Sequence, residues 1–199
     1  EFKGEVIQCA EAELAKISHL ETAQEVIAVC SWPEPKFQIP DAGQLSLYLD
    51  DLRDPGNMGT IIRLADWFGI KQLYTSAATV DWTNPKVIQS SMGSFMRVNI
   101  LAVDPPEFFG KLPTGVLVMG ADLDGESIYA PGQALNGLLV IGSESHGISQ
   151  AIQPFLKKRL HIPTFSPGAN GAESLNAAIA ASLIIGELRR RQIHFQYNG

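Results

Sequence analysis

The chain has 199 residues, of which 45% are apolar and 18% charged, and its formal net charge is −6. This composition is typical of a globular protein and excludes a disordered tail or a coiled coil. No apolar run approaches the roughly 18 residues that a membrane span requires, and the acidic balance excludes a uniformly basic nucleic-acid binder while leaving a local basic patch open.

The first segment, residues 1–43, carries eight acidic and three basic residues and so holds most of the negative charge. A short amphipathic stretch around 11–20 and an apolar run at 26–29 precede a proline-rich passage from Trp32 to Pro40. Proline interrupts helices and central strands, so this passage predicts a linker. About 30 residues cannot bury a core alone. We therefore interpret the segment as the end of a small α/β domain whose start is missing.

The two cysteines, Cys9 and Cys30, lie in no CxxC or Cys/His cluster. Two cysteines cannot form a disulfide framework, so they indicate reduced thiols in a cytoplasmic protein. The first residues do not resemble a signal peptide. Because residue 1 is not methionine, we expect the gene product to begin further upstream.

From residue 44 onward, strands and helices alternate. Short apolar runs predict strands at 45–49, 71–74, 96–101, 116–119, 138–141 and 159–162. Capped or periodic stretches predict helices at 57–68, 84–90 and 173–191. Strands separated by helices imply an α/β fold with a mostly parallel sheet, flanked by helices.

The first candidate site is the polar loop 50–56 and the helix that follows it. We expect Asn57 to cap this helix and Arg63 to lie within its first two turns. Open α/β sheets bind ligands beyond the carboxyl ends of their strands, where this loop lies. A cation near a helix N-terminus costs about 0.3–1 kcal/mol, which a bound phosphate would offset. The alternative is that Arg63 simply pairs with Asp66 on the same helix face.

The second candidate site is the sequence Gly-Ser-Glu-Ser-His-Gly at 142–147, which follows an apolar strand directly. It is neither a Walker A motif nor a GxGxxG motif. Glu144 and His146 do not have metal-ligand spacing, so we expect no metal. The alternative is an ordinary turn between a strand and a helix.

The third candidate site precedes the last helix, after a glycine-rich loop. Glu173 or Ser174 can cap this helix, whose N-terminal amides form a polar lip. Asn176 just inside the helix is less easily explained, because asparagine has poor helix propensity. The body of the helix, residues 177–188, is apolar nearly all round, which predicts burial inside the domain or in a dimer interface.

In this order and spacing, the three segments resemble the motifs of the SpoU-type (TrmH-like) RNA ribose 2′-O-methyltransferases of the SPOUT class. The motifs are Asp54-Pro55-Gly56-Asn57-Met58-Gly59 with Arg63, then residues 141–147, then Ile162-Pro163 followed by Glu173-Ser174-Leu175-Asn176. The resemblance covers about residues 45–192. Residues 1–43 resemble the end of the L30e-like domain that often precedes this catalytic domain, so the expected domains are 1–43 and 44–199.

The resemblance implies features that the hydrophobic periodicity of the sequence cannot predict. The C-terminal part of the sheet is expected to be threaded into a deep trefoil knot, a rare exception to unknotted connections. Its loops are expected to hold S-adenosylmethionine in a bent shape. The family also implies a homodimer with the last helix in the interface, an RNA substrate, no membrane and no metal.

The resemblance places the cofactor on five positions. Backbone groups can bind the edges of adenine, while two apolar side chains pack on its faces. Carried over to this sequence, the cofactor-binding residues are Met119, Gly120, Gly142, Ile162 and Leu175.

The catalytic set implied by the family is Asn57, Arg63, Glu144, Ser174 and Asn176. A ribose 2′-OH attacks the sulfonium methyl, so its proton must be removed and its oxygen aligned. Arg63 acts as a base or holds a phosphate, and arginine rarely gives up its proton. The two asparagines orient the hydroxyl and Arg63, Glu144 holds Arg63 or Asn57, and Ser174 caps the helix and touches the site.

Two alternatives remain open: a knotted methyltransferase that acts on a base nitrogen, and a non-catalytic RNA-binding relative. The motifs do not separate ribosomal RNA from transfer RNA as substrate. Half of the twelve basic residues after residue 43 lie at 157–159 and 189–191, which predicts an RNA-facing basic surface formed partly by a dimer partner.

Overall fold

The computed structural model describes residues 4–18, 22, 24–31, 36–132, 135–165 and 173–198. The chain divides into two compact units, Glu1–Glu34 and Pro35–Gly199. In the first unit, helix α1 (Glu11–Ile17) begins with a hydrogen bond from the Ala10 amide to the Glu13 carboxylate, 2.8 Å long. In the described parts of the chain, no helix is long and apolar enough to cross a membrane.

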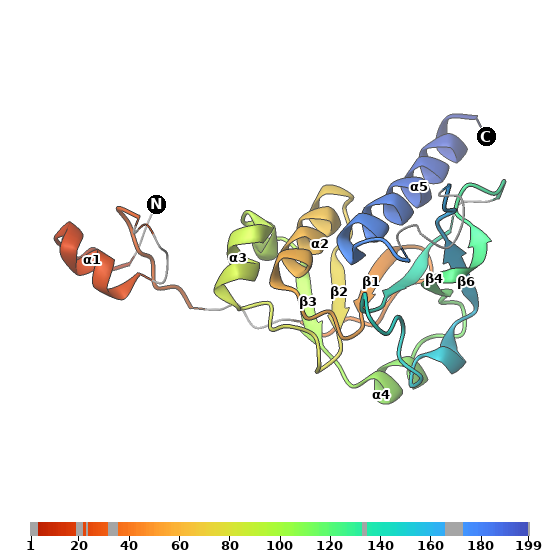
Figure 1. Cartoon of the computed structure of the whole chain (residues 1–199), viewed down its shortest axis with the longest axis horizontal. Helices are drawn as coiled ribbons and strands as arrows, with labels where there is room; N and C mark the ends of the chain where they lie inside the picture. The colour runs from red at the N-terminus through yellow and green to blue at the C-terminus, as the bar shows by residue number, and fades with distance from the viewer. Residues whose placement is uncertain are drawn as a thin grey trace. The chain divides into compact units, whose positions relative to one another are not determined.

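The second unit is built on a single parallel sheet of six strands, in the order β3-β2-β1-β5-β4-β6 (Figure 1). The strands are β1 (Leu45–Leu49), β2 (Gln72–Thr75), β3 (Asn99–Ala102), β4 (Val118–Ser127), β5 (Gly137–Ile141) and β6 (Lys158–His161). The chain moves from β1 outward through β2 to β3, and later fills the other side of β1. The loops after β1 and β5 therefore diverge at a topological switch point, where such sheets bind ligands.

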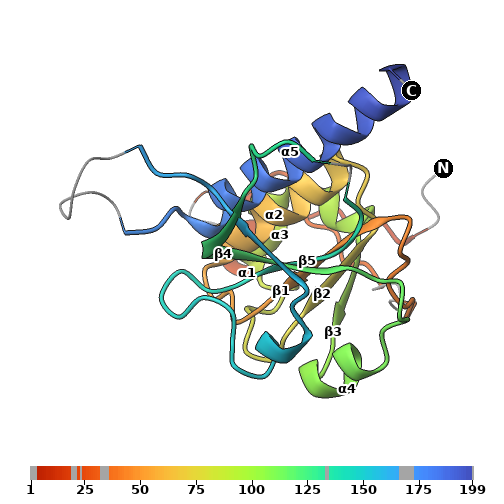
Figure 2. The ribbon, with the colours of Figure 1, turned by 90° about the vertical axis from the view of Figure 1, so that its right-hand side faces the viewer.

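Helices cover both faces of the sheet (Figure 2). One face carries α2 (Pro55–Trp67), α3 (Pro85–Ser91) and the long α5 (Ala177–Asn198). The other carries the short α4 (Pro105–Gly110). The single-turn helices η1 (Ser94–Met96) and η2 (Gln153–Phe155) lie in connections. The expected α/β fold with helices on a parallel sheet is confirmed.

Successive side chains of β1 point to opposite faces of the sheet. Leu47 and Leu49 belong to the core beneath α2 and α5, whereas Tyr48 packs against Phe108 and Phe109 of α4, with ring centroids 5.9 and 4.9 Å away. A shift of one residue would exchange the two faces. The two cores therefore fix the register of β1, and with it the position of the loop that follows.

Helices α2 and α3 approach each other closely at Gly59. A Cβ atom at this position would lie 1.9 Å from Ser90 Oγ, which is far inside contact distance. The glycine of the first motif is thus required by helix packing, and it sets how α2 sits on the sheet.

Four elements differ clearly from the sequence-based expectation. Strand β4 was expected at 116–119 but runs from Val118 to Ser127. Helix α4 was not expected, because six residues are too few to show a helical period; Asp104 caps it by accepting a hydrogen bond from the Glu107 amide. Strand β3 begins at Asn99 rather than at 96, since η1 occupies the preceding residues. Helix α5 begins at Ala177 rather than at 173, because Asn176 is its N-cap.

Candidate active site

Helix α2 is capped by Asp54, not by Asn57. Asp54 Oδ1 accepts a hydrogen bond from the Asn57 amide (2.7 Å), and Pro55 occupies the first helical position, where proline is favourable. The expectation that Asn57 caps the helix is wrong because an aspartate three residues earlier already does so. The Asn57 side chain is left available for other contacts.

Helix α5 is capped by Asn176. Its Oδ1 accepts hydrogen bonds from the amides of Ala178 (3.0 Å) and Ile179 (3.2 Å). The expectations that Glu173 or Ser174 caps this helix, and that Asn176 lies inside it, are therefore wrong. The cap explains a residue that would be unfavourable within a helix, since asparagine is among the best N-caps.

The side chains of Asn57, Glu144 and Asn176 form a hydrogen-bonded cluster, called here the Asn–Glu–Asn cluster. Glu144 Oε1 accepts hydrogen bonds from Asn57 Nδ2 (2.8 Å), Asn176 Nδ2 (3.0 Å) and the Ala177 amide (3.0 Å). Asn176 Nδ2 also lies 2.9 Å from Asn57 Oδ1. Glu144 accepts a hydrogen bond from an amide at the N-terminus of α5, so the helix dipole also stabilises its negative charge there. The cluster joins the three motifs at one point.

The loop that carries Glu144 is held at several places. Ser143 and Gly147 exchange two backbone hydrogen bonds of 3.1 and 2.9 Å. A Cβ at Gly142 would lie 2.3 Å from the Gly147 carbonyl carbon, so only glycine allows this tight turn. Beyond the turn, Asp50 Oδ2 accepts a hydrogen bond from the Ser149 amide (2.7 Å).

Asp50 was not among the residues expected in the site. It is only 3% exposed, directly after β1, and it ties that strand end to the loop carrying Glu144. An acidic residue that immediately follows a largely apolar strand is the signal that could have revealed it. A buried carboxylate in such a place requires a hydrogen-bond donor, and the sequence does not show which one.

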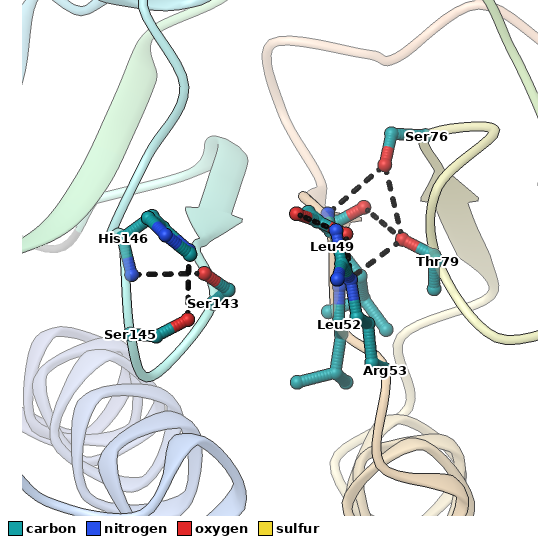
Figure 3. A network of polar contacts seen from close by, with 9 residues as sticks. Leu49, Leu52, Arg53, Ser76, Thr79, Ser143, Ser145 and His146 are labelled. Atoms are coloured by element: carbon teal, nitrogen blue, oxygen red, sulfur yellow. Dashed lines mark hydrogen bonds and ion pairs between the residues drawn. The ribbon is translucent and has the colours of Figure 1, made fainter.

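The loop after β1 is held by hydroxyl groups from the loop after β2 (Figure 3). The Asp51 amide donates to Ser76 Oγ (2.9 Å), and Thr79 Oγ1 donates to the Leu49 carbonyl (3.1 Å) and accepts from the Leu52 amide (3.4 Å). Asp51 has a φ of 54°, which is unfavourable for a residue other than glycine. The two hydroxyls therefore support a strained turn beside the Asn–Glu–Asn cluster.

A cavity of about 230 Å³ opens between the loops after β1 and β5. It lies against the cluster, because Asn57 and Glu144 are both part of its wall. Its lining residues are Asp51, Leu52, Arg53, Asp54, Asn57, Ser143, Glu144 and Ser145.

Arg63 is not brought together with this cluster. It is the ninth residue of α2, in the third turn rather than the first two, because the helix begins at Pro55. Arg63 is exposed and forms no hydrogen bond or ion pair with any residue that the structure describes. The alternative pairing with Asp66 is also wrong: Asp66 pairs with Arg97 at 2.7 Å and accepts a hydrogen bond from Ser94. Glu144 holds Asn57, and not Arg63.

Ser174 is likewise exposed, and in the described part of the chain it makes no hydrogen bond to the cluster. The glycine-rich loop of the third motif, at 168–171, lies outside the described residues.

Three of the five expected cofactor-binding residues follow strand ends or precede α5: Gly142 follows β5, Ile162 follows β6 and Leu175 precedes α5. Met119 and Gly120 were expected at a strand end, but β4 continues to Ser127, so both lie near its start, buried and paired with the neighbouring strands. Ile162 is half-buried, and Leu175 is 43% exposed. Among the described residues, no group of three or more His, Cys, Asp or Glu side chains could hold a metal ion.

Much of the charge of the two basic runs, 157–159 and 189–191, is paired within the chain. Four of their six residues form ion pairs within the chain: Lys158 with Glu126, Arg159 with Asp122, and both Arg190 and Arg191 with Glu187. Hydrogen bonds from Arg190 and then Arg191 lower the pKa of Glu187 to about 2, although burial opposes this. Arg189 is half-buried, and that burial lowers its pKa. Most of this positive charge is therefore neutralised by nearby carboxylates.

The parallel sheet and a polar cluster at its switch point together define a ligand-binding α/β enzyme domain. Residues 44–186 match the SpoU rRNA Methylase family, and the chain belongs to that family. This confirms the assignment drawn from the three motifs.

Named relatives agree with the family match. The chain is 31% identical over 188 residues to 23S rRNA (guanosine(2553)-2′-O)-methyltransferase RlmP of Bacillus subtilis, covering 92% of this chain and 73% of that protein. It is 32% identical over 183 residues to 23S rRNA (uridine(2479)-2′-O)-methyltransferase of Streptomyces viridochromogenes, covering 87% and 62%. Among solved structures, the SpoU methyltransferase AviRb of Streptomyces viridochromogenes in complex with AdoMet is similar with a TM-score of 0.81 and 31% identity, covering 94% and 73%.

Proposed function

We propose that this protein transfers a methyl group from S-adenosylmethionine to the ribose 2′-OH of a nucleotide in structured RNA, either ribosomal or transfer RNA. The observation that carries the proposal is the Asn–Glu–Asn cluster, which joins all three motifs at the switch point of the sheet. The names of the relatives, which are 2′-O-methyltransferases of 23S rRNA, support the same reaction.

The residues present fit S-adenosylmethionine. Leu175 offers exposed apolar surface beside the cluster, and Ile162 and Gly142 directly follow the ends of β6 and β5. An apolar lining with a few backbone donors and acceptors is what an adenosine moiety requires. When bound, the cofactor supplies an electrophilic methyl group. AviRb, with the same fold, is in complex with AdoMet.

The side chains of this chain would align the nucleophile. The amides of Asn57 and Asn176 are oriented by Glu144, so they can hold a 2′-hydroxyl in a fixed direction without rearranging during the reaction. Arg63 holds a phosphate of the RNA next to the target ribose, and this phosphate helps to accept or relay the hydroxyl proton. Ser174 lies next to the site and contacts the substrate or the cofactor.

Digestion of methylated RNA to nucleosides tests the reaction directly. RNA from cells that lack the gene is incubated with the protein and isotopically labelled S-adenosylmethionine, and the nucleosides are separated. We expect the label on 2′-O-methyl nucleosides. Label on a base nitrogen would establish the alternative knotted base methyltransferase. No binding of S-adenosylmethionine by calorimetry would leave only the non-catalytic RNA-binding alternative.

Leu175→Ala is expected to weaken S-adenosylmethionine binding by roughly 1–3 kcal/mol, because one apolar side chain would no longer cover the adenine. Isothermal titration calorimetry measures the change in Kd. The control is Met96→Ala, which removes another exposed apolar side chain, from η1. An unchanged Kd for Leu175→Ala would remove this residue from the cofactor pocket.

We also propose that the protein is a homodimer. Helix α5 exposes an apolar stripe of Ile179, Leu183 and Ile193. Leu183→Glu is expected to shift the protein to a monomer in sedimentation velocity, because a carboxylate would have to be buried in the interface. Lys111→Glu, on α4 across the sheet, is the control. A monomeric wild type would refute the dimer.

The finer features of the fold belong to the same proposal. The C-terminal strands and loops form a deep trefoil knot, as the family resemblance implies, and residues 1–43 are the end of an L30e-like RNA-binding domain with its linker. The catalytic domain spans 44–199. Cys9 and Cys30 are exposed free thiols, which fits a reducing compartment such as the cytoplasm.

A further inference from the structure

Arg53 is an exposed cation with a fixed orientation. Its side chain is 75% exposed, yet Nε and Nη2 both donate to the Asp51 carboxylate, at 2.8 and 3.0 Å. Such a two-pronged pair fixes the plane of the guanidinium. Nη1 donates to no other residue that the structure describes, so one edge and the planar faces stay available.

The turn that places Arg53 is itself strained. Asp51, its partner, has a φ of 54° and is held there by the Ser76 hydroxyl, with Thr79 fixing the residues on either side. Strain of this kind costs about 1–3 kcal/mol and is concentrated at functional sites. A surface ion pair alone would contribute too little to account for it.

Arg53 lines the same cavity as Asn57 and Glu144 of the Asn–Glu–Asn cluster. The cavity has a volume of about 230 Å³ and is large enough to receive one planar base beside the reacting ribose. Base and ribose of the same nucleotide would therefore occupy neighbouring parts of one site.

The charge of the cavity favours a base over a phosphate. Three carboxylates, those of Asp51, Asp54 and Glu144, line it together with the single guanidinium of Arg53. This excess of negative charge repels a phosphate. A neutral base has a face that can stack on a guanidinium and edges that can donate hydrogen bonds to carboxylates.

We propose that Arg53, oriented by Asp51, is a substrate-contacting residue that stacks on the base of the nucleotide to be methylated. This inference rests on the proposed function, since it places the target base next to the cluster that would orient its ribose. Arg53 thereby contributes to choosing which nucleotide enters the site.

The test uses a synthetic RNA hairpin that contains the nucleotide mapped as the methylation site in unmodified ribosomal or transfer RNA. A second hairpin carries an abasic residue at that position. For the wild type, loss of the base is expected to raise KM roughly 10-fold, by the value of one stacked base. Arg53→Gln is expected to raise KM similarly for the normal hairpin, and to make the abasic substitution nearly without further effect.

Two further variants make the result specific. Arg53→Lys keeps the positive charge but lacks the planar guanidinium, so it should raise KM as Arg53→Gln does. Arg97→Gln, which removes another exposed arginine paired with an aspartate, should leave KM for both hairpins unchanged. Melting temperatures show whether each variant is folded.

Several outcomes would overturn the inference. A wild-type KM for Arg53→Gln would mean that Arg53 does not contact the RNA. Arg53→Gln could instead lower the slope of log binding constant against log salt concentration by about one, and weaken the binding of normal and abasic hairpins equally. Arg53 would then be a phosphate contact. If the wild type methylates no RNA at all, the proposed function itself fails, which is a separate result.

Discussion

Replacing Glu144 by alanine is expected to lower kcat for RNA methylation about 100- to 1,000-fold, the size of the effect when one oriented polar group of an active site is lost. Glu144 Oε1 accepts three hydrogen bonds, two from the side chains of Asn57 and Asn176 and one from the start of α5. Without it, both amides lose their orientation. Steady-state methylation of a mapped RNA measures the change, and KM for S-adenosylmethionine should move much less.

The same substitution should destabilise the protein by about 1–3 kcal/mol, because it removes a charged hydrogen-bond acceptor from the N-terminus of α5. Glu144→Gln is the matched control, since its amide oxygen can still accept and its shape is preserved. It should recover most of the stability and part of the rate. If Glu144→Ala keeps a wild-type kcat, the cluster is structural and does not align the hydroxyl.

Arg63→Ala is expected to reduce turnover about 100- to 10,000-fold while leaving S-adenosylmethionine binding unchanged. In the described structure Arg63 is exposed and uncommitted to any partner, as a residue must be if it is to hold a phosphate of the substrate. Removing this group abolishes the assistance to proton transfer, which contributes about 100- to 10,000-fold in enzymes. Single-turnover methylation and calorimetry with S-adenosylmethionine measure the two quantities separately.

Arg97→Gln serves as the control here as well, because Arg97 is an exposed arginine already paired with Asp66 at the far end of α2. It should retain the wild-type rate. Should Arg63→Ala lose cofactor affinity and turnover in equal measure, Arg63 would have a structural role in the cofactor pocket.

Most of the order of elements could be predicted because the six strands and helices α2, α3 and α5 carry local signals, whereas α4 is too short to do so. The apolar run at 45–49 and the Gly-rich turn after Ile141 both appear as expected, and buried side chains alternate along β1. Several residues of the first two motifs serve the backbone of this fold: Asp54 caps a helix, Gly59 allows a close helix contact and Gly142 allows a tight turn.

The roles of individual polar residues could be predicted less well from the sequence. Asn57 was expected to cap a helix and Asn176 to lie inside one, whereas Asp54 caps α2 and Asn176 caps α5. Neighbouring residues with similar capping ability compete, and small differences in chain direction decide between them. Arg53 was not predicted as a site residue because nothing local distinguishes an oriented charge from a solvated one. For Asp50, the only local signal was its place directly after β1.

The sequence by itself therefore determined the fold class, the family and the segments that carry the site. Only the tertiary structure decided that Glu144 joins Asn57 to Asn176, that Ser76 and Thr79 hold the strained turn at Asp51, and that Lys158 and Arg159 pair with Glu126 and Asp122. The physical reason is that these contacts join residues far apart in the chain. Their partners are chosen by strand order and register, which no local pattern encodes.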